Sequence, residues 1–222
     1  MTAGATVFTA LLTPLGANAR IDRSAAYAHI THLAAAGVDA LWACGSCGEG
    51  PILSDDCVVD AGAWLMHEFG DSLTVTMNAG RASTSGTLQL ALRLADVGVK
   101  HIAAVCPYYY SLSADQLVGH LESLLAALPR INIYAYNIPP RTVNDLLPEQ
   151  VGQLAQRGLA GIKDTTDSWE RHCQYLDLAK SSSGAFRVFI GSDALVGPAL
   201  LHGSEGVRIW PLEHQTRLAR GH

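Results

Sequence analysis

Charged residues are scarce in this chain of 222 residues. Asp, Glu, Lys and Arg make up 16% of it, against about 25% in ordinary soluble domains, whereas 49% of the residues are hydrophobic. This composition excludes intrinsic disorder and can fill one large core. The 15 basic residues are outnumbered by 20 acidic ones and never form a run, so nucleic acid is not expected as a partner.

Long apolar runs are also missing. The segment 33–47 is broken by Gly37 and Asp39, well short of the roughly 20 residues that cross a bilayer. The first basic residue is Arg20, so residues 5–12 lack the positive flank of a signal peptide and indicate a first strand. We therefore expect no membrane contact and a cytoplasmic protein.

A disulfide framework is not expected either. The five cysteines are odd in number and spread along the chain, so we expect all of them to be reduced. Cys44 and Cys47 form a C-x-x-C near Trp42, which leaves a thioredoxin-like redox site as an alternative. That alternative is disfavoured because a thioredoxin fold has a different order of strands.

Apolar, β-branched segments recur along the chain with helical patterns between them. The candidate strands are residues 6–12, 38–44, 73–78, 101–106, 131–136, 159–163, 186–190 and 206–210. Capping residues are expected to open helices at Asp22, Ser54, Ser83 and Ser113, and glycines to end them at Gly37, Gly70 and Gly98.

This pattern predicts an α/β fold. Continuous apolar strands are typical of parallel sheets that helices cover on both faces, and eight β/α units close most simply into a (β/α)8 TIM barrel. We expect one catalytic barrel domain over residues 1–210 and a divergent tail over 211–222. An open doubly wound sheet is the alternative, disfavoured because no G-x-G-x-x-G follows the first strand.

Lysine is rare, and one of the three lysines ends a strand. Lys100 precedes the fourth strand and Lys180 ends a helix, whereas Lys163 closes an apolar strand and should reach the mouth of the barrel. Partial desolvation there favours a neutral amine, the nucleophile that Schiff-base chemistry needs. The alternative is a structural pair with Asp164.

The fifth strand ends in a phenol, Tyr136, one strand away from Lys163. A phenol there can pass a proton to or from a carbonyl or alkoxide oxygen. Arg141, on the loop that follows, can hold a carboxylate with its bidentate fork. Taken singly, Tyr136 also fits an interior aromatic residue and Arg141 a solvated loop charge.

The turn after the second strand is rich in glycine. Gly45, Ser46 and Cys47 expose successive backbone N–H groups, which can seat a small carboxylate. Three adjacent tyrosines, residues 108–110, follow the fourth strand, and at least one should face solvent or a partner subunit.

Neither a metal nor an organic cofactor is expected. His29 and His32 are three residues apart, but on a helix of the outer ring, and no histidine ends a strand. A metal-dependent aldolase is therefore disfavoured, and we interpret the histidines as surface or interface residues.

Five motifs together resemble the dihydrodipicolinate synthase/N-acetylneuraminate lyase family of class I aldolases over about residues 5–207. They are GSCGE at 45–49, PYY at 107–109, YNIPPRT at 136–142, GIKD at 161–164 and GSD at 191–193. The resemblance implies that Lys163 forms the Schiff base, that Tyr136 relays protons and that Ser46 is linked to it. It also implies that Tyr109 reaches into a neighbouring subunit's site, hence a homo-oligomer, a dimer or tetramer.

The resemblance further implies that substrate is bound by Gly45, Cys47, Arg141 and Gly191. The implied reaction joins a 2-keto acid such as pyruvate to an aldehyde, and Arg141 favours a 4-hydroxy-tetrahydrodipicolinate synthase, which uses aspartate semialdehyde. A 2-keto-3-deoxy sugar-acid or N-acetylneuraminate lyase is the first alternative. A degenerate barrel without activity is the second.

Two departures from the family pattern qualify this expectation. Cys47 stands where the family usually has threonine, which replaces a hydroxyl contact with a weaker thiol. After Val207 the resemblance ends, so the eighth barrel helix and the family's helical C-terminal segment are expected to be missing or incomplete. We expect this ending to impair activity.

Overall fold

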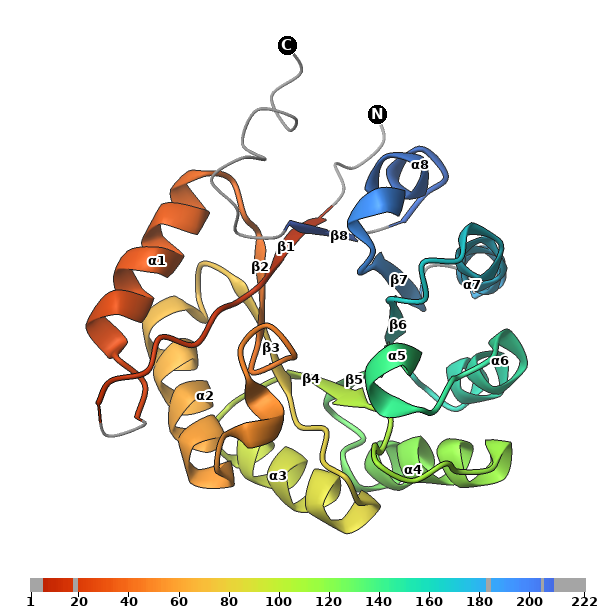
Figure 1. The fold of residues 1–222 in the computed structure, drawn as a ribbon, viewed down its shortest axis with the longest axis horizontal. Coiled ribbons are helices and arrows are strands. Elements are labelled where there is room, and N and C mark those ends of the chain that lie inside the picture. The colour runs from red at the N-terminus through yellow and green to blue at the C-terminus, as the bar shows by residue number, and fades with distance from the viewer. Residues whose placement is uncertain (1–5, 18–19, 183–184, 205, 210–222) are drawn as a thin grey trace.

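The computed structural model describes residues 6–17, 20–182, 185–204 and 206–209 (Figure 1). Their strands form a closed barrel in the order β1 to β8, ringed by helices. Each strand pairs in parallel with its neighbours, and β1 pairs with β8 to close the ring. The expected (β/α)8 barrel is confirmed.

Eight strands and eight α-helices make up the described fold. The strands are β1 Thr6–Ala10, β2 Ala40–Ala43, β3 Thr74–Asn78, β4 His101–Val105, β5 Asn132–Asn137, β6 Gly161–Asp164, β7 Arg187–Ile190 and β8 Gly206–Ile209. The helices are α1 Arg23–Ala35, α2 Asp55–Phe69, α3 Thr84–Asp96, α4 Ala114–Ala127, α5 Pro139–Thr142, α6 Pro148–Gln156, α7 Trp169–Ser181 and α8 Val196–Leu201. Short 3-10 turns, η1 Gly50–Ile52 and η2 Asp193–Leu195, follow β2 and β7.

Side-chain caps determine where four helices begin, as the sequence predicts. Asp22, Ser54, Ser83 and Ser113 each accept a hydrogen bond from a backbone N–H in the following first turn. Ser113 also forms a capping box, because the Gln116 side chain accepts a hydrogen bond from the Ser113 backbone N–H. These bonds satisfy N–H groups that the helices leave without an internal partner.

Aromatic rings fill the barrel interior. Phe8 and Phe189 lie 5.4 Å apart between ring centroids, and Trp42 and Tyr134 pack beside them. A Cβ atom on Gly206 would lie 2.4 Å from Phe189 Cδ1, so only glycine fits beneath this ring. Aliphatic side chains form a second, larger core between the strands and the helices. The interior rings therefore make a dense apolar floor under the barrel mouth.

The C-terminal tail expected over 211–222 lies outside the described residues. Helix α8 precedes β8, so it is the helix of the seventh unit. The segment in which an eighth barrel helix would follow β8 also lies outside the described residues. Within the described part of the chain, no helix is long and apolar enough to span a membrane.

Two histidines contradict the expected surface location. His172 of α7 is fully buried, and His120 of α4 is 2% exposed. His120 Nδ1 lies 2.9 Å from the Thr84 hydroxyl, so the imidazole packs where α3 meets α4. The sequence pattern misses both histidines because their hydrogen-bond partners, Thr84 for His120 and Asp164 and Ser204 for His172, lie in other elements of the fold.

Acid should destabilise the protein through His120. Burial lowers the pKa of this imidazole from 6.5 to about 4 in the folded chain, so the unfolded chain binds a proton first as the pH falls. The free energy of unfolding should decrease from about pH 7 and level off near pH 4, by roughly 3 kcal/mol from this group. Urea unfolding of His120→Leu over this range should give a flatter profile.

His67, exposed near the end of α2, provides the matched control. His67→Leu should keep the wild-type dependence on pH, because its side chain is already in water. A wild-type dependence in His120→Leu as well would contradict the role given to His120.

Candidate active site

A cavity of about 370 Å³ opens at the carboxyl ends of β2 to β5, the end of a β/α barrel where active sites form. Its lining combines a few polar side chains with apolar ones, as is usual for small-molecule sites. The lining residues are Ser46, Glu49, Pro51, Ile52, Asn78, Val105, Tyr108, Tyr136, Ile138, Arg141 and Thr142.

Lys163 lies next to this cavity, inside the barrel. It is 1% exposed, and its Nζ lies 4.3 Å from the centroid of the Tyr136 ring and 4.7 Å from that of Trp42. The register of β5 and β6 causes this contact, because Tyr136 and Lys163 are paired residues on neighbouring strands. The tyrosine ring therefore touches both the cavity and the amine.

Asp164 is directed to the opposite face of β6. Its carboxylate accepts hydrogen bonds from the backbone and hydroxyl of Thr166, and its Oδ2 lies 3.1 Å from His172 Nδ1 on α7. His172 Nε2 in turn lies 2.7 Å from the Ser204 hydroxyl. These contacts join the Asp164 carboxylate to Thr166 and to α7.

Ser46 meets Tyr136 at the cavity wall. The Ser46 hydroxyl lies 3.4 Å from the Tyr136 hydroxyl, although 90 residues separate them in sequence. The turn that carries Ser46 is closed by a hydrogen bond from the Gly50 N–H to the Gly45 carbonyl. A Cβ atom on Gly48 would lie 2.7 Å from the Leu11 carbonyl oxygen, so this turn needs glycine to pack against the end of β1.

The thioredoxin-like redox alternative for this turn is wrong, because the closed β/α barrel does not have the strand order of a thioredoxin fold. All five cysteines are free thiols, and Cys44 is buried. Burial raises the pKa of the Cys44 thiol to about 12, which opposes the thiolate that disulfide exchange requires. Cys44 is therefore a packing residue beneath the turn.

The structure brings some of the expected site residues together and leaves others apart. Ser46, Tyr136 and Arg141 line one cavity, and Lys163 is adjacent to it. The expected substrate-binding residues Gly45, Cys47 and Gly191 are not among the described residues that line it.

Gly191 contacts the lysine-bearing strand instead. Its N–H donates to the Asp164 carbonyl at 2.7 Å, and a Cβ atom at this position would lie 2.2 Å from Thr165 Oγ1. Gly191 thus allows β7 to approach β6 closely where β6 ends.

No metal centre emerges among the residues described. Their His, Cys, Asp and Glu side chains form no group of three or more that is arranged to hold an ion.

A model of the dihydrodipicolinate synthetase family matches residues 3–209. The chain belongs to this family. The 4-hydroxy-tetrahydrodipicolinate synthase of Nostoc punctiforme is 30% identical over 202 residues, which cover 90% of this chain and 68% of the relative.

Two solved structures of similar fold extend the comparison. A prophage protein of the dihydrodipicolinic acid synthase family from E. coli K12, in complex with pyruvate, has a TM-score of 0.85 at 25% identity, over 92% of this chain and 69% of that one. The 2-keto-3-deoxygluconate aldolase from Picrophilus torridus has a TM-score of 0.83 at 25% identity, over 92% and 73% of the two chains.

Tyr109 lies outside the cavity of its own chain in this family member. Its side chain is 80% exposed and its φ is +86°, in the left-handed region that disfavours a bulky residue. Asn144 holds the loop in place: its Nδ2 donates to the carbonyls of Pro107 and Tyr110, and its Oδ1 accepts from the Leu112 N–H. The tyrosine is therefore directed away from the chain by a fixed loop.

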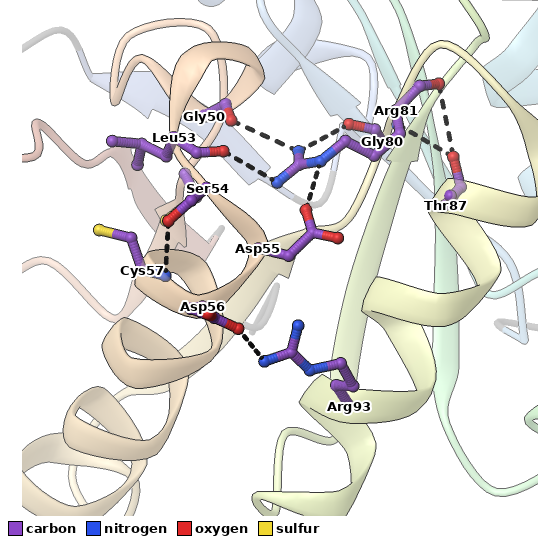
Figure 2. A network of polar contacts seen from close by, with 12 residues as sticks. Gly50, Leu53, Ser54, Asp55, Asp56, Cys57, Gly80, Arg81, Thr87 and Arg93 are labelled. Carbon is purple, nitrogen blue, oxygen red and sulfur yellow. Dashed lines mark hydrogen bonds and ion pairs between the residues drawn. The ribbon is translucent and has the colours of Figure 1, made fainter.

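Arg81 is a positioning residue that the sequence analysis missed (Figure 2). Its Nε donates to Asp55 Oδ1 at 2.8 Å, and its two terminal nitrogens donate to the carbonyls of Gly50 and Leu53, each at 3.4 Å. Since the turn between those carbonyls lines the cavity, Arg81 fixes one wall of the site in this family member. The available signal is an arginine three residues after the last residue of β3, behind Ala79 and Gly80.

Arg81→Lys should lower the free energy of unfolding by about 1–3 kcal/mol, because one ammonium cannot reproduce the fork that bonds a carboxylate and several carbonyls. Denaturant unfolding measures this loss. Arg93→Lys is the matched control, since Arg93 and Asp56 form an exposed ion pair beside the same network and the loss there should stay below about 1 kcal/mol. Equal losses in the two variants would contradict a special role for Arg81.

Proposed function

We propose that this chain is a Schiff-base-forming lyase, a pyruvate-type class I aldolase or synthase most like 4-hydroxy-tetrahydrodipicolinate synthase. One observation carries the proposal: the Lys163 amine lies against the Tyr136 ring, and the hydroxyl of that tyrosine meets Ser46 at a cavity wall. A nucleophile, a proton carrier and a substrate-sized space thus lie together. The likeness to a 4-hydroxy-tetrahydrodipicolinate synthase and to a 2-keto-3-deoxygluconate aldolase supports an aldolase-type reaction.

In the proposed reaction, the Lys163 amine attacks the ketone carbon of pyruvate. Loss of water gives an iminium, and loss of a proton from the methyl carbon gives an enamine. When the methyl carbon loses its proton, the iminium nitrogen accepts the electron pair of that C–H bond. The enamine then supplies an electron pair from the same carbon to form the new carbon–carbon bond with the aldehyde. Hydrolysis of the final imine releases the product and restores the amine.

Tyr136 is proposed to handle the protons of the second half-reaction. When the enamine adds to an aldehyde, the aldehyde oxygen becomes an alkoxide, which the phenol can protonate. Ser46, 3.4 Å from that phenol, can pass the proton onward. The turn that contains Gly45, Ser46 and Cys47 is proposed to seat the keto acid's carboxylate, with the Cys47 thiol in place of a hydroxyl.

Arg141 is proposed to bind a carboxylate on the aldehyde. It lies on α5 at the edge of the cavity, on the β5 side. Aspartate semialdehyde carries such a group, which is why the synthase activity is preferred. The likeness to 2-keto-3-deoxygluconate aldolase supports sugar-acid cleavage as the second candidate.

Tyr109 is proposed to complete the site of a neighbouring copy of the chain. Its exposed ring projects from the loop that Asn144 holds, on a surface that also exposes Tyr110. This role requires a homo-oligomer.

Borohydride reduction in the presence of pyruvate should add one reduced pyruvate to the protein, measured by intact mass and mapped to Lys163. Lys163→Ala should abolish the adduct, whereas Tyr136→Phe should retain it but lose most turnover, because the phenol moves protons and forms no covalent bond. Lys180→Ala, at an exposed ion pair on α7, should trap pyruvate like the wild type. An unchanged mass in the wild type would instead favour the degenerate barrel.

Arg141→Ala should raise the KM for aspartate semialdehyde by roughly tenfold or more, because a bidentate charged contact is lost, and should change the KM for pyruvate much less. Steady-state kinetics with each substrate varied in turn separates the two effects. Equal changes for both substrates would show that Arg141 has a structural role.

A further inference from the structure

One buried acceptor in the cavity wall lacks a hydrogen-bond partner among the described residues. It is the side-chain oxygen of Asn78, the last residue of β3, which is 1% exposed. The other buried polar atoms without a partner in the described chain belong to residues outside the cavity lining, namely His29, Trp42, His120 and Thr165. Asn78 is therefore the member of this group that belongs to the cavity lining.

The orientation of the Asn78 amide is fixed by its other end. Nδ2 donates to the Cys44 carbonyl oxygen at 3.2 Å. Exchange of the two amide ends would place Oδ1 against that oxygen, two acceptors facing each other. Oδ1 is consequently the atom that remains available for a donor.

Asn78 lies at the end of β3, and the cavity that it lines spans the ends of β2 to β5. Pyruvate carries acceptor oxygens and no polar N–H or O–H group, so it has no hydrogen-bond donor to offer the Asn78 oxygen. A donor to this oxygen would therefore belong to the aldehyde part of the substrate.

The charges in this part of the cavity suit a polar partner. Glu49 and Arg141 line the same space and supply one charge of each sign. An aldehyde with both a donor and a carboxylate meets complementary groups here, whereas a purely apolar aldehyde leaves the Asn78 oxygen without a bond.

We propose that Asn78 is a specificity residue, which accepts a hydrogen bond from a hydroxyl or ammonium group on the acceptor aldehyde; this inference rests on the proposed function. Buried acceptors discriminate well, because an analogue without the donor leaves them unpaired after water has been displaced.

Two pairs of aldehydes test the proposal with pyruvate as the common substrate. 2-Hydroxypropanal and propanal differ by one hydroxyl, and aspartate semialdehyde and succinate semialdehyde differ by one ammonium. Wild-type kcat/KM should be roughly tenfold higher for the donor-bearing member of at least one pair, and the pair that responds identifies the donor. Asn78→Leu, similar in size but without an acceptor, should bring that ratio close to one.

Ile138→Val is the matched control, since it trims the same cavity without changing a polar group. It should keep the wild-type ratio. Borohydride trapping of pyruvate should persist in Asn78→Leu, because imine formation at Lys163 precedes aldehyde binding.

The outcomes separate the two proposals. Absence of pyruvate trapping in the wild type overturns the proposed function. Wild-type trapping with ratios near one in both pairs overturns the assignment of Asn78 alone, whether or not the variant folds. The assignment of Asn78 is also overturned if Asn78→Leu still traps pyruvate and keeps the wild-type ratio of kcat/KM between the donor-bearing aldehyde and its analogue.

Discussion

The burial of one amine among aromatic rings is the constraint on which this site depends. Lys163 is 1% exposed and touches Tyr136 and Trp42 in the barrel interior. Removal of a charged amine from water is costly, whereas the faces of aromatic rings attract a cation. The two effects oppose each other, and the ring faces offset part of the cost of burial. The aromatic floor thus helps to determine where the amine lies.

The strand that carries the lysine is held from outside the barrel. Asp164, the next residue, contacts His172 of α7, which contacts Ser204 just before β8. The N–H of Gly191, the residue after β7, donates to the Asp164 carbonyl. Because side chains alternate along a strand, these outward contacts fix the inward direction of Lys163. A group that must be placed within about half an ångström needs such support.

Sequence reasoning located the groups whose position follows from strand order and strand ends. Lys163 and Tyr136 end neighbouring strands, and caps such as Ser113 mark helix starts through contacts three residues away. The groups it missed depend on contacts across loops. Asn78 bonds Cys44, 34 residues away, and Arg81 bonds Asp55, 26 residues away. No periodic pattern encodes pairs of this kind, and the buried histidines were missed for the same reason.

The loops at the barrel mouth carry strain that the rest of the structure maintains. Tyr109 and Val143 have φ values of +86° and +68° and are both largely exposed, so no core packing compensates for a conformation that costs each about 1–3 kcal/mol. Asn144 bonds the backbone on both sides: its Nδ2 donates to the Tyr110 carbonyl after β4 and to the Thr142 carbonyl after β5. A single buried amide therefore links the loop of the exposed tyrosine to the segment that carries Arg141. The positions of the side chains at this site depend on hydrogen bonds to loop backbones, and the barrel strands hold the ends of those loops in place.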